Sequence, residues 1–212
     1  MRMRRVKWAA DYLTEAACRI KNPSEMTGCW KELLGCRKLH VEIGTGKGNY
    51  SLGMAELNPE EGFAAIEKNE SAAGIAAKKY DESGRSNLLL VYDDADHIEE
   101  WFEQGEVDVI HLNFSDPWPK KRNAKRRLSS PGFLKQYEKI LSNDGEIQMK
   151  TDNPSLFEYS LLEMLSAGFE LADVSVDFRR ENHPEDVITE YEEKFIAENK
   201  PIYRSVWKKK TV

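Results

Sequence analysis

Short apolar runs that alternate with helical segments are the feature that most restricts how this chain can fold. Helical periodicity appears between most of the runs, as in Glu70–Tyr80, Gly132–Leu141 and Ser155–Ala167. The alternation predicts a mostly parallel β-sheet with helices on both faces, in which ligands bind beyond the carboxyl ends of the strands. An amphipathic segment, Trp8–Ile20, opens the chain. The candidate strands are Leu39–Ile43, Gly62–Ile66, Leu88–Tyr92, Val107–Leu112, Glu146–Lys150, Glu170–Phe178 and Ile202–Trp207.

The composition agrees with a single α/β domain that has a very polar surface. The 212 residues are 40% hydrophobic and 32% charged, and they contain no internal repeat or Pro/Gly-rich linker. We therefore expect one domain over residues 1–212, with a basic N-terminal arm at about 1–8. No run of about 18 apolar residues is present to cross a membrane, and the basic N-terminus lacks the apolar stretch of a signal peptide. A cytoplasmic location is the expectation.

The cysteines and histidines give no indication of a metal site, and no metal is expected. Cys18, Cys29 and Cys36 form no Cys-x-x-Cys pair, and their odd number is typical of free thiols in a reducing compartment. His40 and His111 lie in or beside apolar runs, where a structural role is favoured over catalysis. The sequence does not decide between a monomer and a homodimer.

Positive charge is concentrated in short segments, although the formal net charge is -6. A phosphate backbone responds to the local field of one protein face, so the average charge is not informative. Two smaller basic groups lie near the two ends of the chain. The alternative interpretation of a cluster of basic residues is a solvated face of a helix. The main group fills eight positions without an acid and comprises Lys120, Lys121, Arg122, Lys125, Arg126 and Arg127.

A glycine-rich turn follows the first candidate strand in the segment Glu42-Ile43-Gly44-Thr45-Gly46-Lys47-Gly48. Glycines at alternate positions allow a tight turn and the close approach of a ligand. Asn49 replaces the third glycine of a dinucleotide fingerprint, and Lys47 lacks the spacing of a Walker loop. Glu42 beside the turn disfavours a pyrophosphate. It favours a ligand without phosphates that carries a cationic centre, which describes S-adenosylmethionine.

Acidic residues also stand at the ends of the next two candidate strands. Glu67 follows the glycine turn at a spacing that lets a carboxylate accept hydrogen bonds from both ribose hydroxyls, in NAD and adenosylmethionine sites alike. Asp93, Asp94 and Asp96 follow the third strand, where one of them can meet the adenine ring; we favour Asp94. Each acid alone is equally compatible with a solvated loop or a helix cap. Their occurrence at three consecutive strand ends favours a cofactor site.

The fourth candidate strand ends in a rigid turn, Asn113-Phe114-Ser115-Asp116-Pro117-Trp118-Pro119, which we call the Asp116 turn. The prolines on both sides of Trp118 restrict the backbone and remove ladder hydrogen bonds. An aromatic platform beside Asp116 suits a planar base, for which stacking is worth about 1–3 kcal/mol. The alternative is that Trp118 fills the core, but the basic run that follows directly disfavours it. The turn therefore indicates an RNA substrate.

Three further motifs follow along the chain, which are Lys125-Arg126-Arg127-Leu128, Lys150-Thr151-Asp152-Asn153 and Thr189-Glu190-Tyr191-Glu192-Glu193-Lys194-Phe195. Together with the glycine turn and the Asp116 turn, extended through Lys120-Lys121-Arg122, they make the chain resemble the bacterial tRNA (guanine-N7-)-methyltransferases. The match runs from about Trp8 to Arg204. The resemblance implies a seven-stranded class I methyltransferase fold, which is a Rossmann-like, doubly wound, mostly parallel sheet with helices on both faces. It also implies methyl transfer from S-adenosylmethionine to N7 of a guanine in the tRNA variable loop.

The resemblance also implies roles for individual residues, with Asp116 as the active-site residue. The residues implied for the cofactor pocket, two glycines of the turn included, are Glu42, Gly44, Gly46, Glu67, Asp94 and Asp116. Those implied for the substrate are Lys120, Asp152, Thr189, Glu190, Tyr191 and Glu192. Those implied for RNA contact are Arg122, Lys125, Arg126 and Arg127. This chain has Asn123 where the family usually has histidine, so no stacking or proton-carrying role follows there.

Methylation at N7 of guanine needs no general base, because N7 has a lone pair in the ring plane and loses no proton. Positioning and electrostatics should then supply most of the rate. The Thr189–Glu193 segment is also a helix start with a capping box, which is compatible with a substrate role. Carboxylates that could hold the guanine N1 and N2 hydrogens and offset the developing positive charge are Asp116, Asp152, Glu190 and Glu192.

Three other interpretations stay open at the level of the sequence. The Asp116-Pro117-Trp118 segment is similar to the Asp-Pro-Pro-aromatic loop of enzymes that methylate amino groups of RNA or DNA bases, although Trp118 stands in place of the second proline. An NAD-linked oxidoreductase is disfavoured by the broken glycine fingerprint. A non-catalytic RNA-binding protein is disfavoured by the intact set of acids.

Overall fold

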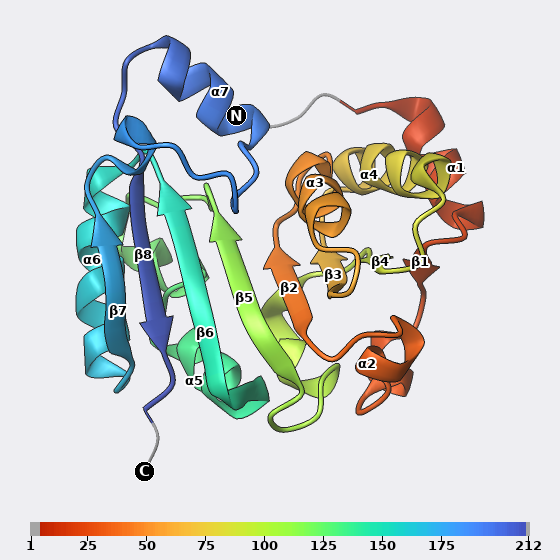
Figure 1. Cartoon of the computed structure of the whole chain (residues 1–212), viewed down its shortest axis with the longest axis horizontal. Coiled ribbons are helices and arrows are strands. Elements are labelled where there is room, and N and C mark those ends of the chain that lie inside the picture. Colours follow the sequence, from red (N-terminus) through yellow and green to blue (C-terminus); the bar gives the residue numbers. More distant parts are fainter. Residues whose placement is uncertain (1–4, 211–212) are drawn as a thin grey trace.

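An open, mostly parallel sheet forms the centre of the molecule (Figure 1). The computed structural model describes residues 5–210, and the predicted arm at about 1–8 therefore lies partly outside the described residues. Within this range the sheet has eight strands in the order β1-β4-β3-β2-β5-β6-β8-β7. These strands are β1 (Arg19–Ile20), β2 (Leu39–Ile43), β3 (Gly62–Ile66), β4 (Leu88–Val91), β5 (Val107–Asn113), β6 (Leu141–Thr151), β7 (Glu170–Ser175) and β8 (Tyr203–Lys208).

Helices lie on both faces of this sheet and across one end of it (Figure 1). Two clusters of buried apolar side chains join the layers. Leu134 and Met164 belong to the cluster under α5 and α6, and Leu13 and Tyr80 belong to the cluster under α1, α3 and α4. The helices are α1 (Lys7–Glu15), α2 (Trp30–Leu33), α3 (Asn49–Leu57), α4 (Glu70–Ser83), α5 (Pro131–Ile140), α6 (Pro154–Ser166) and α7 (Glu190–Ala197).

The sheet changes direction of growth between β2 and β5. From β2 the chain builds β3 and β4 on one side, and it then returns to place β5 and β6 on the other side. Among the described strands, only β8 runs antiparallel to its two neighbours, β6 and β7. In doubly wound sheets the reversal of strand order opens a crevice at the carboxyl ends of the two central strands. That crevice is where the predicted glycine turn and the Asp116 turn meet.

Local sequence signals explain how the helices beside the crevice begin. The side chain of Asn69 accepts a hydrogen bond from the Ala72 amide at 3.1 Å and caps α4, and Asn153 caps α6 in the same way. Helix α1 crosses α4 closely at Gly74, where an added Cβ would lie 2.0 Å from the carbonyl oxygen of Ala9. Glycine at position 74 is therefore what allows α1 to dock.

The predicted fold class is confirmed, and the strand count needs a correction from seven to eight. The additional strand is β1, a two-residue strand that pairs parallel with β4. It lies at the end of the segment Trp8–Ile20, which was expected to be amphipathic throughout, whereas α1 ends at Glu15. A second difference is that β7 ends at Ser175, and a short 3-10 helix, η4 (Phe178–Arg180), follows it. Among residues 5–210, no helix is long and apolar enough to cross a membrane.

Candidate active site

A cavity of about 240 Å³ opens at the carboxyl ends of β2, β3, β4 and β5. The glycine turn, the acids after β3 and β4, the Asp116 turn and the start of α7 all contribute to its lining. Nine of the residues predicted for cofactor or substrate line it, together with one residue of the basic run. These ten are Glu42, Gly44, Gly46, Glu67, Asp94, Asp116, Thr189, Glu190, Tyr191 and Arg126. Distant parts of the sequence thus meet at the predicted edge of the sheet.

The glycine turn is shaped by left-handed backbone at alternate residues. Gly44 has a φ of 82° and Gly46 a φ of 60°, values that side chains rarely allow. A Cβ built on either glycine would have no heavy atom within 4 Å, so both face open space. The turn is held to the sheet, because the Gly44 and Thr45 amides both donate to the carbonyl oxygen of Ile66.

Glu42 lies at the floor of the cavity and is only 4% exposed. Its carboxylate accepts hydrogen bonds from Thr45 Oγ1 at 2.7 Å, Ser51 Oγ at 2.5 Å and Asn113 Nδ2 at 2.9 Å. Three donors from three segments fix its orientation. Asn113, which ends β5, is a site residue that was not predicted from the sequence. Its position at the carboxyl end of a central strand was the signal that could have identified it as part of the site.

Glu67 is held at the mouth of the glycine turn. One carboxylate oxygen accepts from the Gly46 amide at 2.8 Å and the other from the Asn69 amide at 2.7 Å. Burial raises the pKa of Glu67, while these backbone hydrogen bonds oppose the rise by favouring the charged form. Its position facing the cavity therefore costs the Glu67 carboxylate part of its contact with water.

The acids after β4 are more exposed. Asp93 and Asp94 both line the cavity, whereas Asp96 does not. Asp94 pairs with Lys68 Nζ at 3.1 Å, and its amide donates to Asp93 Oδ1. The choice of Asp94 for the adenine contact stays a prediction, since Asp93 occupies the same lip of the cavity.

The Asp116 turn is built on two residues with left-handed backbone. Phe114 has a φ of 50° and Trp118 a φ of 39°, which is uncommon for residues other than glycine. Arg127 secures the turn, because its guanidinium donates to the carbonyl oxygens of Pro117 at 2.9 Å and Trp118 at 3.1 Å. The guanidinium carbon of Arg126 lies 5.0 Å from the Trp118 ring centroid. Trp118 lines the cavity and does not belong to the buried core.

Helix α7 begins with the capping box that the sequence indicated. Thr189 Oγ1 accepts from the Glu192 amide at 3.1 Å, and Glu192 Oε2 accepts from the Thr189 amide at 2.8 Å. Glu190 accepts hydrogen bonds from Lys47 Nζ in the glycine turn at 2.9 Å and from Asn49 Nδ2 at the start of α3 at 2.7 Å. Glu192 is fully buried beneath the cavity and is not part of its lining.

The remaining predicted residues lie outside the lining. Lys120, Arg122 and Lys125 are exposed in and beside the 3-10 helix η3 (Lys121–Arg126), and Asp152 is half-buried after β6. Their contacts with substrate or RNA stay predictions. The guanidinium of Arg127 is engaged with the Asp116 turn and lies 4.2 Å from the Tyr159 ring centroid. Within residues 5–210, no group of three or more His, Cys, Asp or Glu is arranged to hold a metal ion.

Comparison with known proteins agrees with this geometry. A family model described as "Putative methyltransferase" matches residues 36–205. Among solved structures, a 16S rRNA methyltransferase is 18% identical with a TM-score of 0.63 and covers 85% of this chain and 92% of its own. A SAM-dependent methyltransferase from Aquifex aeolicus is 14% identical with a TM-score of 0.57, covering 95% and 98%. These likenesses confirm the methyltransferase fold.

Sequence relatives are much closer and extend over nearly the whole chain. A tRNA (guanine-N(7)-)-methyltransferase from Listeria monocytogenes is 49% identical and the match covers 96% of both chains. One from Bacillus subtilis is 45% identical, with 97% of both chains covered. Together with the cavity and its acids, these findings identify the chain as a member of the tRNA (guanine-N(7)-)-methyltransferase family.

Proposed function

We propose that this protein transfers a methyl group from S-adenosylmethionine to N7 of a guanine in the variable loop of tRNA. The observation that carries the proposal is the meeting, in one cavity, of the acids from three strand ends, the Asp116 turn and the start of α7, with the basic segment beside them. We further propose that residues 1–212 act as one domain in the cytoplasm, where bacterial tRNA is modified.

The residues present fit the cofactor. The open space above Gly44 and Gly46 allows a ligand to lie directly on the backbone. Glu67, fixed by two backbone amides, presents a carboxylate that can accept ribose hydroxyl hydrogens. Asp94 at the far lip would meet the adenine, and the buried charge of Glu42 favours a cationic ligand. When bound, S-adenosylmethionine supplies a methyl group on a positively charged sulfur.

The side chains around the Asp116 turn would position the guanine. Asp116, Glu190 and Tyr191 line the same cavity, and Tyr191 stacks on Phe114 with a centroid separation of 6.0 Å. Carboxylates at 116 and 190 can accept the N1 and N2 hydrogens of guanine and offset the positive charge that develops on the purine. No proton has to be removed from N7, so orientation of the base is the main task of these residues.

The exposed basic segment would hold the RNA backbone near this cavity. Lys120, Arg122 and Lys125 are exposed, and Arg126 reaches from the same segment to Trp118 at the cavity wall. Phosphate contacts of this kind release counterions, so tRNA affinity should fall steeply with salt. An affinity that stayed flat between low and moderate salt would contradict the role of this segment.

The decisive experiment is a methylation assay with labelled cofactor and unmodified tRNA, followed by nucleoside analysis. We expect 7-methylguanosine, and we expect it to disappear when the variable-loop guanine is changed to adenine. Asp116→Ala should abolish most of the transfer, whereas the matched control Asp144→Ala, an exposed acid away from the cavity, should not. A methylated amino group in place of 7-methylguanosine would replace the proposed reaction with the alternative one.

A further inference from the structure

Four charged side chains are buried together beneath the cavity without lining it. The side chains of Lys150, Arg179, Asp186 and Glu192 are 2%, 9%, 8% and 0% exposed. Lys150 Nζ lies 2.7 Å from Asp186 Oδ2 and 3.1 Å from Glu192 Oε2. Arg179 donates to Glu192 Oε1 at 2.9 Å and also binds Asp186. Two positive and two negative charges therefore balance within this cluster, which we call the buried ion cluster.

Stability is a weak explanation for such a cluster. Removing four charges from water is costly, and well-packed apolar side chains in the same place are often as stable or more so. What charged side chains provide is a fixed geometry, because each hydrogen bond has a direction as well as an energy.

Lys150 connects two walls of the cavity. Its carbonyl oxygen accepts a hydrogen bond from the Phe114 amide at 2.8 Å, at the start of the Asp116 turn. Its side chain reaches the carboxylate of Glu192 in α7. The residue at the end of β6 thus bonds through its backbone to one substrate-facing segment and through its side chain to the other.

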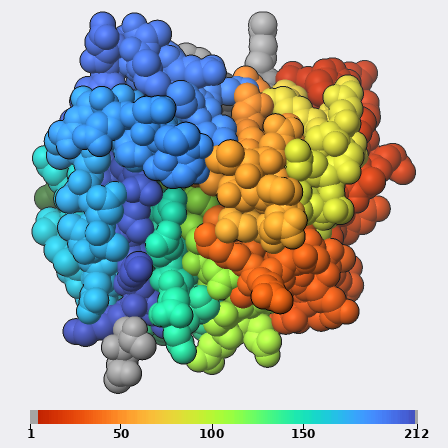
Figure 2. All heavy atoms as spheres, in the orientation of Figure 1, coloured from red at the N-terminus to blue at the C-terminus, as the bar shows by residue number. Residues whose placement is uncertain are grey.

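Glu192 passes this constraint on to the residues that face the cavity. Besides Lys150 and Arg179, its carboxylate binds the Thr189 amide in the capping box. Thr189, Glu190 and Tyr191, which line the cavity, are therefore attached to the sheet through one buried carboxylate. Figure 2 shows the segment before α7 packed over the front of the molecule beside α3, in agreement with the proximity of Val187 to Gly53.

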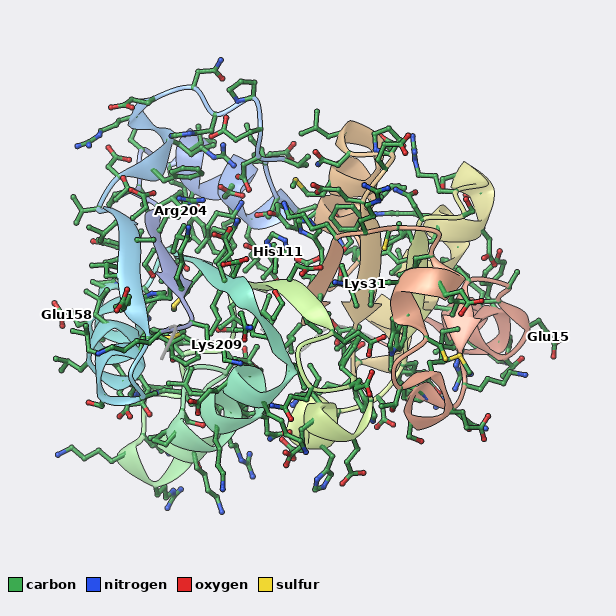
Figure 3. The ribbon with its side chains drawn as sticks, turned by 60° about the horizontal axis from the view of Figure 1, so that its bottom comes forward. Glu15, Lys31, His111, Glu158, Arg204 and Lys209 are labelled. Carbon is green, nitrogen blue, oxygen red and sulfur yellow. The ribbon has the colours of Figure 1, made fainter. Side chains whose placement is uncertain are left out.

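A third wall is reached through Tyr50 in α3, directly after the glycine turn. Tyr50 lines the cavity, its hydroxyl donates to Asp186 Oδ1 at 2.9 Å, and Lys150 Nζ lies 4.5 Å from its ring centroid. Behind it, His111 Nδ1 is 3.3 Å from the Tyr50 hydroxyl, and His111 lies at the centre of the molecule (Figure 3). Burial lowers the pKa of His111 well below its ordinary value, so this neighbour is neutral and leaves the charge balance intact.

We propose that Lys150, Arg179, Asp186 and Glu192 are positioning residues for methyl transfer, which hold the start of α7 in register with the Asp116 turn and the glycine turn. This inference rests on the proposed function and deepens it. Glu192 then acts on the substrate through Thr189, Glu190 and Tyr191, because its own oxygens already bind Lys150, Arg179 and the Thr189 amide.

The test restores the charge balance of the buried ion cluster without restoring its hydrogen bonds. An effect on the position of the α7 start can then be separated from an effect on protein stability. Glu192→Gln leaves one uncompensated positive charge, although glutamine can still accept from the Thr189 amide. Adding Lys150→Met removes that charge. We expect Glu192→Gln to lower both the melting temperature and kcat. We expect the double variant to recover the melting temperature, while its kcat remains on the order of a hundredfold below that of the wild type. Recovery of kcat together with the melting temperature would overturn the proposal.

Two further measurements keep the test decisive if the double variant folds poorly. Arg179→Lys preserves the charge but not the fork that binds both carboxylates, and we expect a lower kcat with unchanged affinity for S-adenosylhomocysteine. Wild-type kcat in this variant, or an equal loss of S-adenosylhomocysteine affinity, would overturn the positioning role. Glu193→Gln, an exposed acid in the same helical turn, is the matched control. A wild-type protein that forms no 7-methylguanosine overturns the proposed function, whereas full turnover in the variants overturns the positioning alone.

Discussion

The bond between Arg127 and the Asp116 turn allows a quantitative prediction. Hydrogen bonds from a charged donor contribute about 1.5–3 kcal/mol each when buried, and Arg127 makes two to the carbonyl oxygens of Pro117 and Trp118. These two hydrogen bonds offset the free-energy cost of the left-handed backbone at Phe114 and Trp118, which is of order 1–3 kcal/mol per residue. Because the side chain of Arg127 is only partly buried, we take about 2 kcal/mol as the loss on removing it.

Such a loss should appear in turnover more than in RNA affinity. A loss of about 2 kcal/mol in the ordered turn corresponds to a roughly 30-fold lower kcat/KM. We therefore expect Arg127→Ala to lower kcat/KM by about this factor and to leave the salt dependence of tRNA binding unchanged. The matched control is Lys125→Ala, an exposed cation two residues earlier, which should reduce the salt slope by about one and lower turnover little at low salt.

The assay is methyl transfer at several salt concentrations, with tRNA binding measured in parallel. If Arg127→Ala reduced the salt slope and kept normal turnover at low salt, Arg127 would be a phosphate contact, as the family resemblance implies. The reasoning from the turn geometry would then be wrong.

Three further predictions concern the cofactor, the thiols and the packing of α1. Burial raises the pKa of Glu67, so its carboxylate takes up a proton at a higher pH than an ordinary glutamate does, and cofactor affinity should fall as the pH is lowered from neutrality. Calorimetry with Glu67→Gln should give a weaker and nearly pH-independent affinity. Burial and the neighbouring Asp81 raise the pKa of the Cys18 thiol, so native protein should react with a thiol reagent at exposed Cys29 and not at Cys18. Cys29→Ser should therefore remove the fast phase of the reaction with the reagent. Gly74→Ala forces a Cβ against the Ala9 carbonyl and should destabilise the protein by about 1–3 kcal/mol in urea unfolding, and an unchanged midpoint would contradict the close crossing of α1 and α4.

Short strands rich in apolar residues were predictable, because a strand buried on both faces has few positions that suit a polar side chain. Leu39–Ile43 and Gly62–Ile66 form β2 and β3 with the expected bounds. β1 was not predicted, since two residues give no periodicity and its pairing with β4 depends on a distant part of the chain. Helix α3 was not named either, because its residues combine apolar side chains with Ser51 and Gly53 in no clear stripe.

The site was predictable where its residues stand at strand ends, and not where they depend on long-range ion pairs. Glu42 and Glu67 were located by the rule that ligands bind at the carboxyl edge. The capping box of Thr189 and Glu192 was visible because both partners lie within one helical turn. The partner of Glu192, Lys150, is 42 residues away, and no local pattern indicates such a pair.

The position of β8 between β6 and β7 has a consequence for how the protein is made. β7 pairs only with β8 among the described residues, and the Phe178 amide beyond β7 donates to the Ile202 carbonyl at the entry to β8. A chain that is still leaving the ribosome can therefore assemble the strands from β1 to β6, while β7 has no neighbouring strand to pair with. We expect nascent chains that end before Tyr203 to bind S-adenosylhomocysteine but to leave β7 open to protease. The last strand to emerge then decides when the far edge of the sheet closes.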